Sequence, residues 1–321
     1  MAYYLGIDVG SITTKVVVLD EQDRLLSKAY IRNNGRPIEA IQLGMEKILG
    51  HLDEGSIQGV ATTGSARQLA AYLVGADIIK NEITAHSIAV IDIYPEAKTI
   101  IEIGGQDSKV IVLRNSVVAD FAMNTVCAAG TGSFLDQQAA RLGVSIETFG
   151  TLSLRSNHPV RIAGRCTVFA ETDMIHKQQI GHSVEDIVAG LCDSLVKNYL
   201  NNVCRGKEIL SPIVFQGGVA ANQGIRKAIE KELGVFLIVP DHFDVMGAIG
   251  AAKLVKRANP SRTCFRGFRF LRESCSPRGF ECNECENCCE VIQLLVRDQV
   301  VAFWGDLCER YRVQAPDPKH P

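Results

Sequence analysis

A short segment near the N-terminus combines a carboxylate, a glycine turn, hydroxyls and a lysine. The groups that could bind a ligand are Asp8, Gly10, Ser11, Thr13, Thr14 and Lys15. Asp8 suits hydrated Mg²⁺, which binds one or two carboxylates and keeps several waters. Gly10 lets a ligand approach the backbone, and turn amides with hydroxyls bind phosphate oxygens. The segment therefore predicts a magnesium- and phosphate-binding turn, with an ordinary polar hairpin turn as the alternative.

Residues 103–109, with the sequence IGGQDSK, repeat this arrangement. Gly104 and Gly105 form the second turn, and an acid and an amide follow them directly. Either Gln106 or Asp107 could orient the attacking water opposite Asp8 in a nucleotide hydrolase. The repetition favours phosphate binding over a chance hairpin.

A third glycine segment, residues 215–222, follows a short apolar run and precedes a helical pattern. Gly217 and Gly218 would let an adenosine lie against the backbone, and Asn222 stands at the start of the helix. The GxxxxGK[ST] spacing of a P-loop is absent from the sequence, which indicates a different nucleotide fold.

Cys127 and Cys166 each precede a predicted helix, at Ala128–Leu142 and Val168–Gln179. Free backbone amides and the helix dipole stabilise an anionic cluster at such a position. Two thiolates do not complete a four-thiolate site, but a two-fold dimer uses the same patch twice and supplies four. The alternative is a pair of small buried cysteines.

Seven of the eleven cysteines lie in the last 58 residues. The candidate ligands there are Cys275, Cys282, Cys285, Cys288, Cys289 and Cys308. Tetrahedral thiolate sites suit zinc and iron–sulfur clusters alike, so structural zinc, a second cluster and free thiols all stay open. Cys192 and Cys204 are expected to be buried packing residues. Five arginines between Arg262 and Arg278 form either a docking face for an acidic partner or a solvated linker.

The elements that position these residues follow an alternating α/β pattern in which a strand–turn–strand unit occurs twice. The first unit is Tyr3–Val9 with Thr14–Asp20, and the second is Thr99–Ile103 with Lys109–Leu113. Further strands are predicted at Leu25–Ile31, Ile57–Ala61, Val117–Phe121, Ile213–Phe215, Val235–Val239, Val291–Val296 and Gln299–Trp304. Further helices are predicted at Pro37–Leu49, Glu82–Ile93, Val184–Asn202, Ala220–Leu233 and Val245–Arg257. The pattern predicts an internally duplicated α/β architecture.

A length of 321 residues fits about two domains. We expect lobe I at residues 1–94, lobe II at 95–257 with helix 245–257 returning to lobe I, and a cysteine-rich module at 258–321. A net charge of −2 argues against nucleic-acid binding through bulk basicity. No apolar run is long enough for a membrane span, and the N-terminus lacks a signal peptide, so we expect a cytoplasmic protein.

The three glycine segments resemble the two phosphate motifs and the adenosine motif of the sugar kinase, actin and Hsp70-type ATPase superfamily. That resemblance implies two ribonuclease H-like lobes with ATP or ADP and Mg²⁺ in the cleft. Gly247 opens residues 247–252, GAIGAA, which resemble the helix connecting the lobes. Ordinary close helix packing is the alternative for that segment.

The segments 126–132 and 164–171 resemble those of the 2-hydroxyacyl-CoA dehydratase activators, a family that includes the benzoyl-CoA reductase ATPase subunits. The resemblance covers about residues 3–256. It implies a homodimer with one bridging [4Fe-4S] cluster, to which Cys127 and Cys166 of each subunit contribute. It also implies ATP-driven transfer of low-potential electrons from a ferredoxin or flavodoxin to an iron–sulfur dehydratase or reductase.

Two other functions fit parts of the sequence. A small-molecule kinase of the same fold, acting on a sugar or an acyl group, would use the nucleotide segments but not Cys127 and Cys166. A zinc-bearing, nucleotide-dependent regulatory protein would use the cysteine-rich tail. The shorter activators end near Lys253–Arg257, so the tail departs from them and leaves the partner open.

Overall fold

A computed structural model describes residues 2–48, 52–124 and 128–311. The chain forms two compact units, of which unit 1 comprises residues 1–89 with 247–321 and unit 2 comprises residues 90–246. The sequence places boundaries at 94 and 257, whereas the structure groups the whole of 247–321 with the N-terminal residues. In the described ranges, no helix has both the length and the apolar character needed to cross a bilayer.

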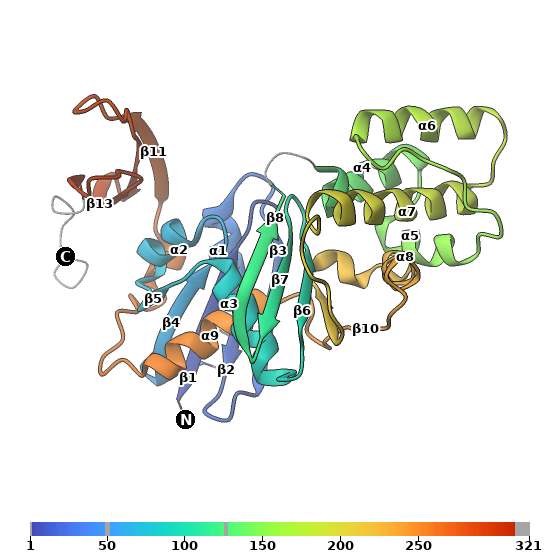
Figure 1. Cartoon of the computed structure of the whole chain (residues 1–321). Coiled ribbons are helices and arrows are strands. Elements are labelled where there is room, and N and C mark those ends of the chain that lie inside the picture. Colours follow the sequence, from blue (N-terminus) through green and yellow to red (C-terminus); the bar gives the residue numbers. More distant parts are fainter. Residues whose placement is uncertain (1, 49–51, 125–127, 312–321) are drawn as a thin grey trace. The chain divides into compact units, whose positions relative to one another are not determined.

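Unit 1 is built on a five-stranded sheet with the order β3-β2-β1-β4-β5 (Figure 1). Its strands are β1 (Tyr3–Val9), β2 (Thr13–Leu19), β3 (Leu25–Arg32), β4 (Ile57–Thr63) and β5 (Ile78–Ile79). Strand β1 pairs antiparallel with β2 and parallel with β4. Both β1 and β2 are buried along almost their full length, which explains their continuous apolar runs.

Four helices accompany this sheet. They are α1 (Pro37–Ile48), α2 (Arg67–Val74), α3 (Glu82–Ile93), which crosses into unit 2, and α9 (Met246–Ala258). Helix α2 was not predicted, because its eight residues are too few for a clear period and no side chain caps its start. A Cβ on Gly250 of α9 would lie 1.8 Å from the Ala85 carbonyl oxygen, so the small residues of α9 allow close helix packing.

Unit 2 repeats the topology with the sheet order β10-β9-β6-β7-β8. Its strands are β6 (Thr99–Ile103), β7 (Ser108–Arg114), β8 (Val117–Met123), β9 (Ile213–Gln216) and β10 (Leu237–Ile238). Again an antiparallel hairpin comes first, and β6 pairs parallel with a strand from much later in the chain. The predicted internal duplication is thereby confirmed.

Figure 1 shows a group of helices in unit 2, in green to gold. They are α4 (Gly132–Leu142), α5 (Ile146–Leu154), α6 (Thr167–Gln179), α7 (Val184–Asn202) and α8 (Gln223–Leu233). The predicted helix Ala220–Leu233 is divided into a short 3₁₀ turn, Gly218–Ala221, and α8. One core joins these helices to the sheet through residues such as Ile101, Phe134 and Phe215.

The last part of unit 1 is a three-stranded antiparallel sheet, called here the C-terminal sheet. It consists of β11 (Cys275–Glu281), β12 (Glu290–Val296) and β13 (Gln299–Trp304). The hairpin of β12 and β13 was predicted, and β11 was not. Leu294 and Ala302 enter the same core as β1 and β4, and the rings of Tyr72 and Trp304 stack with centroids 5.6 Å apart. The C-terminal sheet is therefore packed onto unit 1.

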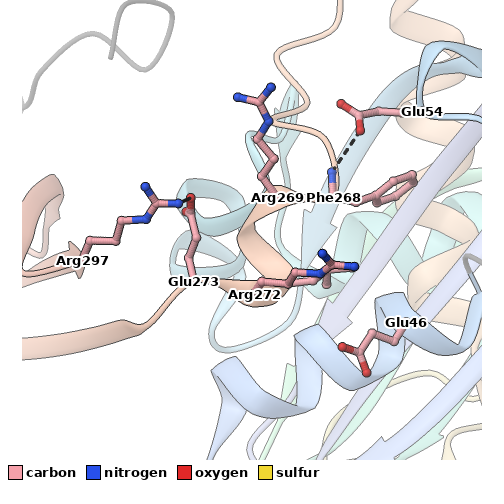
Figure 2. Close-up of a pocket in the computed structure, with 8 residues that line it drawn as sticks. Glu46, Glu54, Phe268, Arg269, Arg272, Glu273 and Arg297 are labelled. Atoms are coloured by element: carbon pink, nitrogen blue, oxygen red, sulfur yellow. Dashed lines mark hydrogen bonds and ion pairs between the residues drawn. The ribbon is translucent and has the colours of Figure 1, made fainter.

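A hollow of about 580 Å³ lies between helix α1 and the segment that leads into the C-terminal sheet (Figure 2). Arg269 and Arg272 line it, and the guanidinium of Arg297 pairs with Glu273 at 2.9 Å. Arg266 is not among its lining residues, and burial lowers the pKa of that guanidinium. Of the five arginines, two therefore line the hollow, Arg266 is partly buried, and Arg262 and Arg278 are exposed and do not line it.

Candidate functional site

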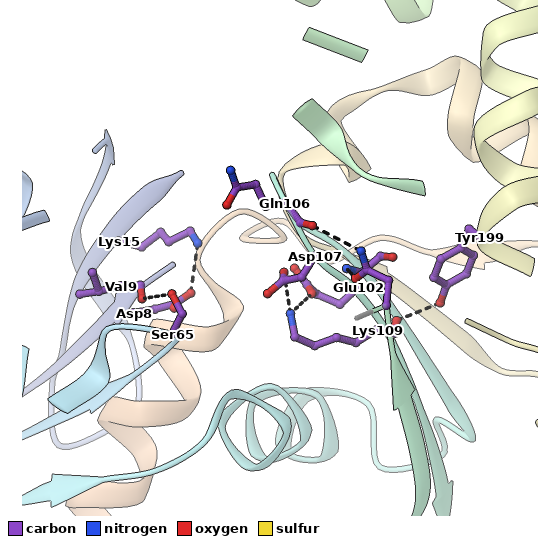
Figure 3. A network of polar contacts seen from close by, with 11 residues as sticks. Asp8, Val9, Lys15, Ser65, Glu102, Gln106, Asp107, Lys109 and Tyr199 are labelled. Carbon is purple, nitrogen blue, oxygen red and sulfur yellow. Dashed lines mark hydrogen bonds and ion pairs between the residues drawn. The ribbon is translucent and has the colours of Figure 1, made fainter. Parts of the chain in front are cut away.

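The carboxylate of Asp8 lies near the end of β1, opposite Lys15 of β2 in the strand register. Lys15 Nζ is 3.2 Å from Asp8 Oδ2 (Figure 3). Asp8 is only 5% exposed, and the antiparallel hairpin is what brings the lysine to it. The sequence segment 8–15 therefore places a carboxylate and a lysine beside a tight turn, which is compatible with binding a phosphate or a cation.

Two glycines leave space around the Asp8 carboxylate. Gly64 follows β4 with a φ of +91°, and a Cβ there would lie 2.6 Å from Asp8 Oδ1. A Cβ on Gly247 would lie 2.8 Å from Asp8 Oδ2. Thr63 pairs with Asp8 in the sheet, and its buried Oγ1 has no hydrogen-bond partner among the described residues. These features fit a hydrated cation, which needs oxygen ligands and room beside them.

The turn after Asp8 is held by its own hydrogen bonds. The Gly10 amide donates to the Thr13 carbonyl at 3.0 Å, and Asn33 Nδ2 donates to the Gly10 carbonyl at 2.6 Å. Thr14 Oγ1 in turn donates to Asn33 Oδ1 at 2.7 Å. Thr14 therefore orients Asn33, and Ser11 is the exposed hydroxyl of the turn.

Unit 2 carries a corresponding ion pair at its own hairpin. Glu102 of β6 lies opposite Lys109 of β7, as Asp8 lies opposite Lys15. Lys109 Nζ lies 2.8 Å from Glu102 Oε2 and 2.8 Å from Asp107 Oδ1 (Figure 3). The Lys109 side chain is 1% exposed, so one buried ammonium holds two carboxylates.

Glycines also leave space around the carboxylates of Glu102 and Asp107. Gly217 follows β9 with a φ of +90°, and a Cβ there would lie 2.8 Å from Glu102 Oε1. A Cβ on Gly104 would lie 3.0 Å from Asp107 Oδ1. Ser108 Oγ is buried and, like Thr63 Oγ1, has no hydrogen-bond partner among the described residues. Unit 2 thus repeats the carboxylate, lysine and glycine arrangement of unit 1.

Glu102 is the functional candidate that the sequence analysis missed. Asp8 and Gly10 are separated by one residue at a strand end, and so are Glu102 and Gly104. Comparing the two turns by this spacing would have found it. Of the residues predicted at this turn, Asp107 is half-buried, and Gln106 is exposed, with its carbonyl accepting a hydrogen bond from Asn124.

The second turn is joined to helix α4. The Gly132 amide donates to the Gly104 carbonyl at 2.9 Å, and the Ser133 amide donates to the Gly105 carbonyl at 2.7 Å. These bonds satisfy amides of the first helical turn, which have no partner inside a helix. The position of the turn is therefore tied to the start of α4.

The third glycine segment has a structural role of its own. The Gly217 amide donates to the Phe243 carbonyl at 2.9 Å, and Gly218 is exposed. Asn222 caps α8, its Oδ1 accepting from the Ile225 amide at 3.1 Å. Exposed backbone at Gly218 is compatible with a bound adenosine.

Cys166 stands at the N-cap of α6 and is half-buried. Val168 and Phe169, in the first turn of α6, are both 66% exposed. Cys127 lies outside the described residues. Cys192 and Cys204 are buried in the core, and burial raises their pKa values to about 12 and about 11, so both are neutral packing thiols.

The tail cysteines differ in exposure. Cys282 is buried, Cys275 and Cys289 are half-buried, and the others predicted as ligands, Cys285, Cys288 and Cys308, are exposed. Within the described part of the chain, no three side chains of His, Cys, Asp or Glu are grouped so that they could hold a metal ion.

Comparisons with known proteins agree on one family. The model of the BadF/BadG/BcrA/BcrD ATPase family matches residues 5–255. The 2-hydroxyisocaproyl-CoA dehydratase activator of Clostridioides difficile is 36% identical over 253 residues, which are 78% of this chain and 93% of that protein. The crystal structure of component A of the Acidaminococcus fermentans (R)-2-hydroxyglutaryl-CoA dehydratase matches with a TM-score of 0.74 at 33% identity, over 81% of this chain and 99% of that one.

A more distant structure shares the fold alone. A ROK family glucokinase from Streptomyces griseus matches with a TM-score of 0.51 at 12% identity, over 80% of this chain and all of that chain. The predicted sugar kinase, actin and Hsp70-like fold is confirmed. The family match ends at residue 255, so the cysteine-rich segment lies beyond it.

Proposed function

Because the chain belongs to the BadF/BadG/BcrA/BcrD ATPase family, we propose that it is an ATP-dependent reductive activator. In this proposal a homodimer carries one bridging [4Fe-4S] cluster. ATP hydrolysis drives single electrons at low potential from a ferredoxin or flavodoxin to a separate iron–sulfur enzyme of the dehydratase or reductase type. The observation that carries the proposal is Cys166, a half-buried thiol at the start of a helix with exposed apolar neighbours.

The nucleotide would be bound by the glycine turns of both units. Asp8 would hold Mg²⁺ through its waters, and the ion would neutralise charge on the phosphate oxygens. Other amides of the two turns would bind phosphate oxygens, because the Gly10 amide already donates to the Thr13 carbonyl and the Gly104 amide to the Asp107 carbonyl at 2.8 Å. Glu102 and Asp107, with Gln106 beside them, would orient the attacking water, and Lys109 Nζ holds both carboxylates in place at 2.8 Å.

The cluster would be bound by Cys127 and Cys166 of each subunit. Cys166 lies where the free amides at the start of α6 favour a negatively charged ligand. Val168 and Phe169 expose apolar surface beside this thiol. Covering that surface would be favourable, because apolar side chains gain free energy when they are removed from water. A second copy packed on this surface would cover both side chains and supply the remaining two thiolates.

A continuous set of contacts connects the unit 2 turn with Cys166. Gly104 and Gly105 accept the first amides of α4. Arg141 near the end of α4 pairs with Glu171 of α6 at 2.8 Å, and Cys166 begins α6. We infer that α4 and α6 transmit changes at the turn to the cluster. A shift of about 60 mV corresponds to roughly 1.4 kcal/mol for one electron, so a few hundred millivolts is within reach of nucleotide-driven rearrangement.

The test uses Cys166→Ser in the full chain, with Cys192→Ala as the matched control for loss of a cysteine. Both proteins are purified without oxygen, and iron, sulfide, ATP hydrolysis and ATP-dependent reduction of a low-potential acceptor are measured. We expect Cys166→Ser to lose about two irons per chain, half of a bridging [4Fe-4S] cluster, and its electron transfer. Cys192→Ala should keep both.

Retention of ATP-driven electron transfer by Cys166→Ser would refute the proposal. Phosphate transfer from ATP to a sugar by the wild-type chain, with no electron transfer, would instead support the kinase alternative. Zinc without iron and without turnover would support the regulatory alternative.

A further inference from the structure

The loop between β11 and β12 holds four cysteines, and two of them begin and end a closed turn. The Cys282 amide donates to the Cys289 carbonyl at 2.8 Å, which closes the base of the loop. Inside the loop, the Cys288 amide donates to the Cys285 carbonyl at 3.2 Å, which is the hydrogen bond of a four-residue β-turn. Cys285 and Cys288 are therefore the first and last residues of one β-turn.

This turn brings Cys285 and Cys288 within reach of a disulfide bond. The first and last Cα atoms of a β-turn are less than about 7 Å apart. A disulfide joins residues whose Cα atoms are roughly 4.4–6.8 Å apart. The Cys288 side chain also lies against the turn, because its Sγ donates to the Cys285 carbonyl oxygen at 3.8 Å. The Cys288 thiol is thus held close to the backbone of Cys285.

The same two cysteines are accessible to a reagent in solution. Cys285 and Cys288 are exposed, whereas Cys282 is buried and Cys289 is half-buried. The Tyr311 hydroxyl donates to Cys282 Sγ at 3.8 Å, which gives that thiol a partner inside the fold. Cys288 has a φ of +43°, a left-handed conformation that residues with a side chain rarely adopt. Because exposed and strained disulfides are the labile ones, a bond at this turn should also be readily reduced.

Cys308 is a third exposed thiol that the fold brings towards the loop. Arg310 pairs with Glu284 of the loop, and the hydroxyl of Tyr311 reaches Cys282. Among the described residues, however, no hydrogen bond joins Cys308 itself to the loop. The turn therefore favours Cys285 as the partner of Cys288, and Cys308 provides a matched control.

We propose that Cys285 and Cys288 form a redox-active pair, which a low-molecular-weight disulfide oxidises to an intramolecular disulfide. The Cys285 thiolate attacks one sulfur of the reagent, and the other sulfur leaves as a thiolate. The Cys288 thiolate then attacks Cys285 Sγ in the mixed disulfide and releases the second thiolate. The two cysteines lose two electrons and two protons in all, and the reagent takes them up to become two thiols. The pair lies beyond residue 255, where the family match ends, and it does not depend on the proposed function.

The experiment equilibrates the full chain, purified without oxygen, with mixtures of reduced glutathione and glutathione disulfide. Free thiols are then alkylated, and the protein is digested after glutamate. Cleavage after Glu286 separates Cys285 from Cys288, so mass spectrometry detects their disulfide as two joined peptides. We expect the joined fraction to rise with the share of glutathione disulfide and to fall again when reduced glutathione is restored. Cys288→Ser should instead carry one glutathione on Cys285, because the second step has no thiol.

Three variants test whether the turn selects this pair. Cys308→Ser and Cys289→Ser remove neighbouring thiols and should leave the equilibrium unchanged. Asn287→Pro keeps both thiols but disfavours the turn. Glu286 and Asn287 have negative φ, as in a type I turn, and proline at the third position forces the preceding residue out of the conformation that this turn requires. The equilibrium constant for forming the disulfide should therefore fall by about tenfold in Asn287→Pro.

Persistence of Cys285 and Cys288 as thiols at every glutathione ratio would overturn the proposal. A bond from either cysteine to Cys289 or Cys308 would also overturn it, as would an unchanged equilibrium in Asn287→Pro. A thermal unfolding scan of each variant establishes that it is folded. Because the digest reports on the loop alone, the result is the same whether or not a bridging cluster forms elsewhere in the protein.

Discussion

The hairpins of units 1 and 2 share one arrangement but differ in burial and charge. In unit 1, Asp8 faces Lys15, whose side chain is 16% exposed. In unit 2, Lys109 is 1% exposed and holds both Glu102 and Asp107. The named groups sum to zero in unit 1 and leave one negative charge in excess in unit 2.

This difference in burial predicts how each hairpin responds to substitution of its ion-pair residues. The buried ammonium of Lys109 stabilises the local fold, because without it the buried carboxylate of Glu102 would have no counter-charge. A more accessible pair is less costly to break and better placed to exchange its partner for a ligand. We expect unit 2 substitutions to affect stability first and unit 1 substitutions to affect activity first.

The largest expected effect is that of Lys109→Met. It leaves the buried carboxylate of Glu102 without its ammonium and removes the partner of the half-buried Asp107, which should lower the free energy of unfolding by about 4 kcal/mol. Lys15→Met, the matched change in unit 1, should cost about 2 kcal/mol, as the loss of one hydrogen bond to a charged group does. Denaturant unfolding measures both. Equal losses of unfolding free energy in the two variants would show that the ion pairs of the two hairpins do not differ in their contribution to stability.

Gly217→Ala tests whether the glycine is required for space as well as for conformation. Its Cβ would lie 2.4 Å from the Ile103 carbonyl oxygen at a φ of +90°, so we expect a loss of about 3 kcal/mol. Gly143→Ala also has a positive φ, +68°, but nothing within 4 Å, and should cost about 1 kcal/mol. If the two variants lose the same free energy of unfolding, the lack of space around Gly217 is not the reason that a glycine is needed there.

Exchanging the two acids tests whether the hairpins are interchangeable. Asp8→Glu and Glu102→Asp each move a carboxylate by about one methylene within its glycine surroundings, so we expect the kcat of ATP hydrolysis to fall by about 100-fold. Steady-state phosphate release measures this for each variant and for the double exchange. Full activity of the double variant would show that the two positions are equivalent.

The smallest expected effect is that of Tyr199→Phe. The buried Tyr199 hydroxyl donates to the Lys109 carbonyl at 2.9 Å, and its removal should cost about 1 kcal/mol. Tyr94→Phe, at a half-buried tyrosine of the same unit, should change the free energy of unfolding by less than about 0.5 kcal/mol. If Tyr94→Phe lowered the free energy of unfolding as much as Tyr199→Phe, the hydrogen bond from Tyr199 to the Lys109 carbonyl would not be the cause of the loss at Tyr199.

Long periodic segments were predictable from the sequence. The helix Val184–Asn202 and the strands on either side of both turns have the predicted type. The helix buries residues along its length, and the strands are short, continuously buried apolar runs. Glu102 was within reach of the same reasoning, through its spacing from Gly104. Asn33 was not, since its bond to Gly10 depends on how β3 ends beside the turn.

Contacts between distant segments could not be predicted. Gln42 of α1 donates to the Phe270 carbonyl at 2.9 Å, across 228 residues of sequence. Nothing in the composition of residues 258–321 indicates that Leu294 shares a core with β1. Likewise, the sequence did not reveal strand β11, so its pairing with β12, which places Cys275 opposite Val296, could not be predicted.

The packing of the C-terminal sheet on unit 1 has a consequence for proteolysis. Two hydrogen bonds hold the segment that connects α9 to the C-terminal sheet. The Cys264 amide donates to Asp77 Oδ1 at 2.6 Å, and the Arg266 amide donates to the Val74 carbonyl at 2.9 Å. Beyond it, Phe270, Leu294 and Ala302 are 3% exposed or less. A protease that cut the exposed residues just after α9 would therefore nick the chain without releasing its last 60 or so residues, and the two fragments would separate only under denaturing conditions.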